Sequence, residues 1–229
     1  MKLIITCEHA FPDVPEKYQH LFAEDKGVLH THEGYDPGTF DLFEQIKDLA
    51  DCTFVQEISR LLIESNRSTW HKSLYSRFST GLSDLEKKDL LDVYYWPYRD
   101  KVQNSIASFI KDGHEVFHLS VHSFTPVLNE SIRNADIGLL YDPQRRAEKE
   151  LSARWKKLIA GKMPELKVRY NYPYLGKSDG FTTALRKNFK SNYLGIELEI
   201  NQEWVKDNRM DPDIKQVISN TLGHLKNKA

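Results

Sequence analysis

Short apolar runs of strand length alternate along this chain with longer segments in which apolar residues recur at helical spacing. The runs are rich in β-branched residues, whereas the longer segments repeat every three or four positions, as amphipathic helices do. The predicted strands cover residues 3–7, 53–57, 115–123, 135–141, 166–170 and 192–201. The predicted helices cover residues 39–50, 84–112 with an interruption near Trp96-Pro97, 144–161, about 180–190, and 211 to the C-terminus. This alternation favours an α/β fold: a three-layer sandwich with a mixed, mainly parallel sheet.

Two segments lack a regular period and are expected to be loops. Residues 20–38 are rich in polar and turn residues, and residues 68–83 are aromatic and basic, as in a loop or lid. Each precedes a predicted helix. Thr39 or Asp41 is expected to cap the helix at 39–50, and Ser178 or Asp179 the helix near residue 180.

Two predicted strands end in a histidine. The strand at 115–123 leads into Val121-His-Ser-Phe-Thr-Pro126. Proline cannot donate to a sheet and holds its predecessor extended, so this strand should stop near Ser123 and leave His122 at its mouth. The first strand is followed directly by Glu8 and His9. Ligands of open α/β sheets bind at the carboxyl ends of strands, although either histidine alone also suits a core or loop residue bonded to a carbonyl.

Acidic and basic residues complete a candidate catalytic site. Asp36 stands just ahead of the first predicted helix, and two histidines with one carboxylate give three ligands and an open fourth position, as in catalytic zinc sites. Glu197 and Glu199 share one face of the last strand. Either is suited to activate a metal-bound water, and the alternative is that both point to solvent. Asn66-Arg67 suits either a surface turn or a fork-shaped grip on a substrate carboxylate.

Composition narrows the class of function. The chain has 229 residues, of which 40% are hydrophobic and 28% charged, so we expect a single domain over residues 1–229. The 32 basic and 33 acidic residues leave a formal net charge of −1, which favours a small-molecule partner over nucleic acid or a membrane. Only Cys7 and Cys52 occur, the N-terminal apolar stretch is shorter than a signal-peptide core, and no run reaches transmembrane length. A cytoplasmic location is therefore expected, while the oligomeric state stays open.

An ordered set of motifs resembles the N-formylglutamate amidohydrolase family. The motifs are Cys7-Glu-His-Ala10, His32-Glu-Gly-Tyr-Asp-Pro-Gly38, Ser59-Arg-Leu with Ser65-Asn-Arg67, Val121-His-Ser-Phe-Thr-Pro126, Asn171-Tyr-Pro-Tyr-Leu-Gly176 with Ser178-Asp-Gly180, and Leu198-Glu-Ile-Asn201. Each is short, but together they span nearly the whole chain in the family's order. The resemblance implies one domain of this family over residues 1–229, a carboxypeptidase-like (phosphorylase/hydrolase-like) fold and one zinc ion per chain.

The resemblance also implies roles for particular residues. His9 and His122 match zinc ligands, and Glu199 matches the water-activating glutamate. Related carboxypeptidases carry a glutamate ligand three residues after the first histidine, but this chain has Pro12 there. Asp36 is therefore our choice of third ligand. Glu33 and Glu8 are the alternatives.

The implied substrate is an N-formyl or other N-acyl acidic amino acid, whose amide bond is cleaved. Asn66 and Arg67 match the pair that holds a substrate carboxylate in the related carboxypeptidases. Further candidates for this pocket are Arg133, Tyr174, Lys177 and Arg186. Glu199 would take a proton from the zinc-bound water and pass it to the leaving amine, while zinc, with Arg67 or another cation, stabilises the oxyanion. Alternatives are a small peptidase or cell-wall amidase, or a metal-binding or regulatory homologue without turnover, which would usually have lost Glu199.

Overall fold

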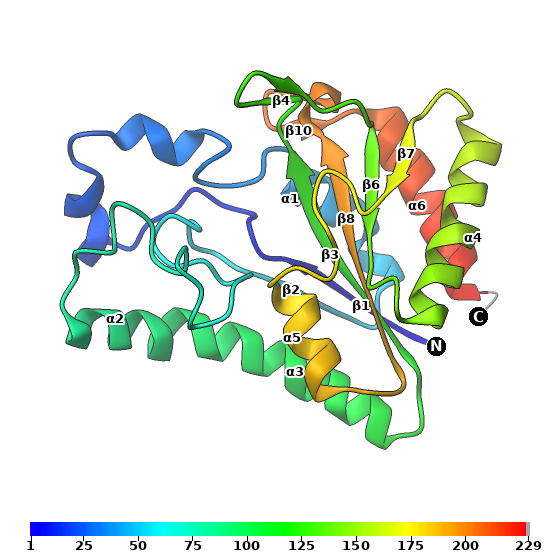
Figure 1. Ribbon diagram of the computed structural model, residues 1–229, viewed down its shortest axis with the longest axis horizontal. Helices are drawn as coiled ribbons and strands as arrows, with labels where there is room; N and C mark the ends of the chain where they lie inside the picture. The colour runs from blue at the N-terminus through cyan, green and yellow to red at the C-terminus, as the bar shows by residue number, and fades with distance from the viewer. Residues whose placement is uncertain (228–229) are drawn as a thin grey trace.

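The structure, a computed structural model, describes residues 1–227 and is built around a six-stranded sheet with the order β2-β1-β3-β8-β6-β7 (Figure 1). Its strands are β1 (Lys2–Cys7), β2 (Cys52–Val55), β3 (Val116–Phe124), β6 (Ile137–Leu140), β7 (Val168–Tyr170) and β8 (Tyr193–Asn201). β2, β1, β3 and β8 are parallel to one another, β6 is antiparallel to β8, and β7 is parallel to β6. The prediction of a mixed, mainly parallel sheet is confirmed.

Helices cover both faces of this sheet. They are α1 (Thr39–Ile46), α2 (Asp84–Leu90), α3 (Trp96–Lys111), α4 (Arg146–Lys162), α5 (Phe181–Asn188) and α6 (Pro212–Asn227). On one face, Leu42 of α1, Trp155 of α4 and Ile218 of α6 join one apolar core with the strands. On the other, Val102 of α3 and Leu185 of α5 pack in a second core. The predicted three layers are therefore confirmed, with α4 and α6 at one side of Figure 1 and α3 and α5 below the sheet.

The two faces of β3 differ in a way that positions the site. Side chains alternate along a strand, and Phe117, Leu119 and Val121 belong to the core beneath α1, α4 and α6. The opposite face begins with apolar Val116 and then becomes polar, with His118, Ser120 and His122 toward the carboxyl end; all are buried. Polar groups are thus gathered at the end of the sheet where parallel strands present their carboxyl termini.

Two expected helix caps are wrong. The N-cap of α1 is Gly38, whose φ of 78° lies in the left-handed region that favours glycine, rather than Thr39 or Asp41. The N-cap of α5 is Gly180, rather than Ser178 or Asp179. The Asp179 carboxylate instead accepts hydrogen bonds from the backbone N–H and hydroxyl of Ser68. Asp179 therefore binds a loop that is distant in the sequence and does not cap α5.

The predicted interruption of the 84–112 helix is a single π-helical turn at Leu91–Tyr95 that joins α2 to α3. The N–H of Trp96 donates to the carbonyl of Leu91, five residues back, and Pro97 follows at the start of α3. The final predicted helix is α6, and its expected continuation to the C-terminus lies outside the described residues.

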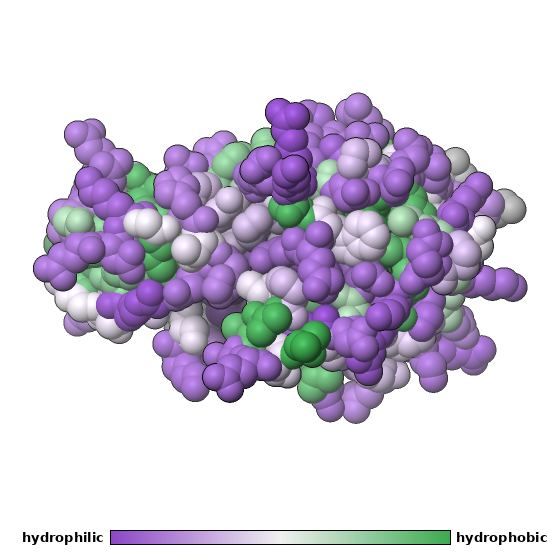
Figure 2. Space-filling model, turned by 90° about the horizontal axis from the view of Figure 1, so that it is seen from above, coloured by the Kyte–Doolittle hydropathy of each residue, from purple (hydrophilic) through white to green (hydrophobic). Residues whose placement is uncertain are grey.

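Loops and short elements frame the end of the sheet. The expected loop at 20–38 contains the end of one 3-10 helix, Glu16–Phe22, and the whole of a second, Lys26–His30. These pack with residues 58–63 and α2 in a third apolar cluster that lies beside the sheet (Figure 1). The remaining elements are the strand pairs β4 (Val127–Leu128) with β5 (Ser131–Ile132) and β9 (Val205–Lys206) with β10 (Arg209–Met210), and the 3-10 turns Lys47–Leu49 and Gln202–Trp204. Hydrophilic side chains cover most of the face shown in Figure 2. Across residues 1–227, no helix has both the length and the apolar character that a bilayer crossing requires.

Candidate metal and active site

Residues from three neighbouring strands meet at the carboxyl end of the sheet. His9 follows β1, His122 lies near the end of β3, and Glu199 lies near the end of β8. His122 and Glu199 are paired in the parallel register of these strands. Asp36 reaches the same place from the loop before α1, and its backbone N–H donates to the carbonyl of His9 at 2.9 Å. The structure thus brings together four residues that lie far apart in the sequence.

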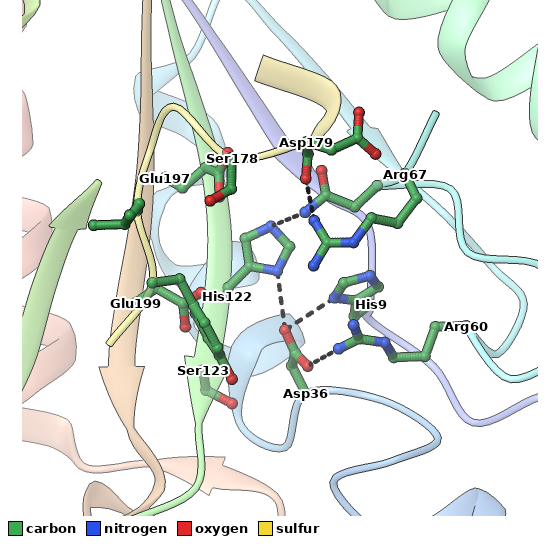
Figure 3. Close-up of a pocket in the computed structure, with 13 residues that line it drawn as sticks. His9, Asp36, Arg60, Arg67, His122, Ser123, Ser178, Asp179, Glu197 and Glu199 are labelled. Carbon is green, nitrogen blue, oxygen red and sulfur yellow. Dashed lines mark hydrogen bonds and ion pairs between the residues drawn. The ribbon is translucent and has the colours of Figure 1, made fainter. Parts of the chain in front are cut away.

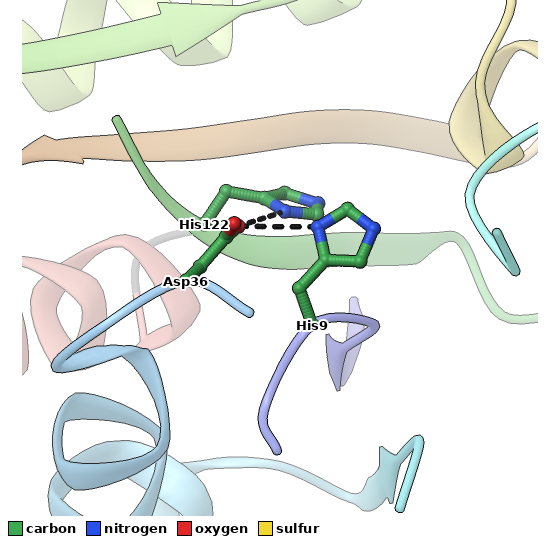
Figure 4. A group of neighbouring side chains, drawn as sticks. All are labelled: His9, Asp36 and His122. Carbon is green, nitrogen blue, oxygen red and sulfur yellow. Dashed lines mark hydrogen bonds and ion pairs between the residues drawn. The ribbon is translucent and has the colours of Figure 1, made fainter. Parts of the chain in front are cut away.

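Three of these side chains converge on one point (Figure 4). Asp36 Oδ2 lies 3.1 Å from His9 Nδ1 and 2.9 Å from His122 Nδ1. One ligand atom from each residue lies within 4.8 Å of the other two, and all three residues are buried. Two imidazole nitrogens and one carboxylate oxygen are a donor set that suits zinc and leaves a position open for water or substrate.

A hydrogen-bond acceptor stands behind each histidine ring. Glu64 Oε1 lies 2.6 Å from His9 Nε2. Behind His122, Nε2 lies 2.8 Å from the hydroxyl of Ser120, which donates to Glu8 Oε2 at 2.6 Å. A ring whose Nε2–H donates to such a group keeps the Nδ1 lone pair available to a metal. Both rings therefore present Nδ1 on the side of Asp36.

Charge at the site is strongly coupled. Burial opposes ionisation of Asp36, but His9, His122 and Arg60 hold the pKa of its carboxyl well below the usual range. Burial likewise lowers the pKa of His122, yet its hydrogen bonds to Asp36 and Glu8 outweigh that effect and raise the pKa well above the usual value. The cluster of buried carboxylates therefore favours a positive charge at its centre, which either a proton or a metal ion supplies.

Glu199 is the member of the group whose carboxylate makes no hydrogen bond or ion pair within residues 1–227. It is 5% exposed, and its Oε2 accepts no hydrogen bond from residues 1–227. Burial raises the pKa of this carboxyl to about 8. An unpaired buried carboxylate oxygen needs an explanation, because such groups are nearly always satisfied. A bound cation or a water next to it supplies one, so the residues present fit a divalent metal.

A cavity of about 380 Å³ opens over these groups (Figure 3). Asn66 and Arg67 form part of its wall. The Asn66 side-chain oxygen accepts from the N–H of Phe181 at 2.7 Å, and Arg67 donates through Nη1 to the carbonyl of Asp179. The Arg67 carbonyl in turn accepts from the Tyr95 hydroxyl at 2.6 Å. Arg67 is thus held in position by neutral groups, which leaves its charge for a ligand.

The other predicted pocket residues divide between the cavity and elsewhere. Tyr174 lines the cavity and is 45% exposed. Arg133 does not line it but stacks on the Tyr174 ring, 5.0 Å from its centroid, and donates to its hydroxyl at 3.1 Å. Lys177 is exposed and also outside the lining. Arg186 is 6% exposed, and its Nε donates to buried Glu148 at 3.0 Å. The structure places Arg186 in a buried ion pair rather than in the pocket.

Of the three acidic residues considered for the third ligand, Asp36 alone lines the cavity. Glu33 is partly exposed and pairs with Arg77 at the surface. Glu8 is buried behind His122, where it accepts from Ser120 and from the Tyr98 hydroxyl. Neither shares the space between the two Nδ1 atoms.

Arg60 and Glu64 also belong to this cluster, although the sequence alone indicates no role for either. Arg60 donates to Asp36 Oδ1 at 3.2 Å and to Glu64 Oε2 at 2.9 Å, so it links the carboxylate between the histidines to the one behind His9. Arg60 and Glu64 lie in residues 58–67, which form turns rather than a regular element. The signal that could have found them is the Ser59-Arg-Leu motif and the position of Glu64 two residues before Asn66.

Comparison with known proteins gives a consistent result. The sequence model of N-formylglutamate amidohydrolase matches residues 1–205. No curated protein sequence is significantly similar to the chain. A gene product of Agrobacterium tumefaciens has a similar structure, with 25% identity, a TM-score of 0.78, and coverage of 99% of this chain and 89% of that chain. An N-formylglutamate amidohydrolase from Ralstonia eutropha shares the fold at 14% identity, with a TM-score of 0.69 and coverage of 99% and 94%.

Proposed function

Because the chain belongs to the N-formylglutamate amidohydrolase family, and is accordingly an amidohydrolase of α/β fold, we propose that it is zinc-dependent and cleaves the amide bond of an N-formyl or other N-acyl amino acid. The observation that carries this proposal is the convergence of His9, Asp36 and His122 beside the unpaired carboxylate of Glu199. The family resemblance of the sequence predicts an acidic substrate, and the α-carboxylate of any N-acyl amino acid supplies the group that Arg67 is suited to bind.

Three residues would hold the metal, namely His9 and His122 through Nδ1 and Asp36 through a carboxylate oxygen, with one zinc ion per chain. Bound there, zinc would act as a Lewis acid that lowers the pKa of a coordinated water toward about 7 and polarises the scissile carbonyl. Glu64 and the pair Ser120 and Glu8 keep the two rings in the tautomer that offers Nδ1.

Glu199 is the proposed general base. Its free Oε2 can accept the proton of the attacking water without first breaking a hydrogen bond within residues 1–227, and the protonated carboxyl can then donate to the leaving amine. The rise of its pKa to about 8 makes it a stronger base than an ordinary carboxylate, although a neighbouring cation brings the pKa down.

The arginines have separate proposed tasks. Arg67 offers a planar fork that matches the geometry of a substrate carboxylate, with Asn66 beside it. Arg60 also lines the cavity, next to Asp36, and is placed to stabilise negative charge as it develops on the carbonyl oxygen. Since the cavity draws residues from 9 to 199, we further propose that residues 1–229 act as one domain on a small-molecule substrate.

The test is turnover by the purified protein, with its metal removed by a chelator and then restored. Hydrolysis of N-formyl amino acids that is lost on chelation and recovered with zinc supports the proposal. Hydrolysis of short peptides or muramoyl peptides in place of N-formyl amino acids would favour the peptidase or cell-wall amidase alternative. Tight zinc binding with no turnover of any amide would favour a homologue without catalysis.

A further inference from the structure

The walls of the cavity carry opposite charges (Figure 3). Arg60 and Arg67 lie on one side of the close-up, and Glu197 and Glu199 lie on the other, with the histidines between them. Amide hydrolysis as proposed uses Glu199 and leaves Glu197 without a task.

The side of the cavity that carries Arg60 and Arg67, the cationic wall, can pair with one further carboxylate. Arg60 is already paired, at 3.2 Å from Asp36 and 2.7 Å from Glu64. Arg67 makes no ion pair within residues 1–227, and its side chain donates a hydrogen bond to the neutral backbone carbonyl of Asp179. The α-carboxylate of an N-acyl amino acid would take the remaining N–H groups of Arg67, and no second unpaired cation lines the cavity in the described part of the chain.

The opposite side, the anionic wall, carries Glu197 and Glu199, and one carboxylate oxygen of Glu197 has no hydrogen-bond donor within residues 1–227. Glu197 precedes Glu199 by two residues on β8 and pairs in register with Ser120, so its side chain leans to the same face as the site. The hydroxyl of Thr182 donates to Glu197 Oε1. No donor within residues 1–227 reaches Oε2, and Glu197 forms no ion pair with them. The residue is only partly buried and lines the cavity.

We propose that this cavity selects a substrate with a single carboxylate, bound by Arg67, and a hydrogen-bond donor or amine, bound by Glu197. This inference rests on the proposed hydrolase function and narrows its substrate class to N-acyl amino acids with amide- or amine-bearing side chains, such as glutamine or lysine. The side-chain carboxylate of glutamate would meet Glu197 instead of a cation. Two carboxylates of like charge repel each other, and this repulsion is what excludes the acidic substrate.

The sharpest test compares N-formylglutamine with N-formylglutamate, which have nearly the same shape and differ in charge. The zinc-loaded wild type is expected to show a kcat/KM at least about tenfold higher for N-formylglutamine, the size of effect that an unpaired like charge produces. Glu197→Gln should reduce this ratio to about threefold or less, mainly by a gain on N-formylglutamate. Glu165→Gln is the matched control. It makes the same change in net charge at an exposed position after α4, and it should keep the wild-type ratio.

A binding measurement separates this inference from the hydrolase proposal. Calorimetric titration of zinc-loaded Glu199→Gln, which lacks the base, should show tighter binding of N-formylglutamine than of N-formylglutamate. That result together with a wild type that hydrolyses neither compound would support the pocket and refute the hydrolase. A wild type that prefers N-formylglutamate, a ratio unchanged by Glu197→Gln, or failure of both compounds to bind would overturn the inference.

Discussion

The buried carboxyl of Glu199 makes a direct prediction about stability and pH in the metal-free protein. Burial raises its pKa from 4.5 to about 8, a rise of about 3.5. Each pKa unit corresponds to about 1.4 kcal/mol of difference between the protonation states, so the ionised form costs the fold up to about 5 kcal/mol. Replacing Glu199 with glutamine removes the ionisation and keeps the shape.

The sign follows from proton linkage. Below pH 4.5 the carboxyl is protonated in both the folded and the unfolded chain, and Glu199 imposes no penalty. Between pH 4.5 and about 8 the folded chain retains a proton that the unfolded chain releases, so the free energy of unfolding of the wild type falls as pH rises. Above pH 8 the full penalty is present. Glu199→Gln should therefore match the wild type near pH 4.5 and exceed it by about 3 to 5 kcal/mol at pH 9.

Urea unfolding of the metal-free proteins between pH 5 and pH 9 measures this difference directly. Titrating groups away from the site are common to both proteins, so their contributions cancel in the comparison. The exposed variant Glu165→Gln serves as the control and should stay parallel to the wild type across the range. With zinc bound, a cation near Glu199 favours the ionised form, and the gap at pH 9 should shrink. Curves for wild type and Glu199→Gln that stay parallel from pH 5 to 9 would refute the reasoning.

Three further predictions concern single residues of the site. Arg67→Lys keeps the charge but loses the planar fork, so KM for an N-acyl amino acid should rise with little change in metal content; kinetics equal to the wild type would count against the carboxylate pocket. Glu199→Gln should lower turnover by about a hundredfold or more with zinc retained, whereas Glu197→Gln should lower the turnover of N-formylglutamine far less. Reversed effects would make Glu197 the base instead. Glu8→Gln weakens the hydrogen-bond acceptor behind Ser120 and His122, so zinc affinity should fall by about tenfold or more. A competition assay with a chromophoric chelator measures this affinity, and an unchanged value would deny Glu8 a positioning role.

Much of this architecture follows from local sequence because the relevant signals are strong and short in range. The apolar run before His122 and the proline at 126 place the end of β3, and the same logic places His9 after β1. The turn Tyr-Asp-Pro-Gly ahead of a helical pattern holds Asp36 near a helix N-terminus. Since carboxyl ends of parallel strands meet at one edge, these separate predictions imply that the residues are close together.

The remaining features depend on contacts that local sequence does not record. Arg186 is a candidate for the substrate pocket on sequence, but Glu148, 38 residues earlier in the chain, pairs with it in the core. Arg60 and Glu64 lie in turns with no periodicity, so only their tertiary contacts with Asp36 and His9 reveal that they belong to the site. Glu197 and Glu199 occupy equivalent positions in the alternating pattern of the last strand. Only the structure shows that Glu197 is partly buried and accepts from Thr182, whereas Glu199 is buried.

The metal content of purified protein tests the central claim most directly. Elemental analysis after dialysis against zinc should find about one zinc ion per chain in the wild type and none in the double variant His9→Ala, His122→Ala, since two of the three ligands are gone. Circular dichroism of the variant should show a folded chain, and Glu165→Gln should bind zinc as the wild type does. A full complement of zinc in the folded double variant, or none in the wild type, would contradict the assignment of the metal centre.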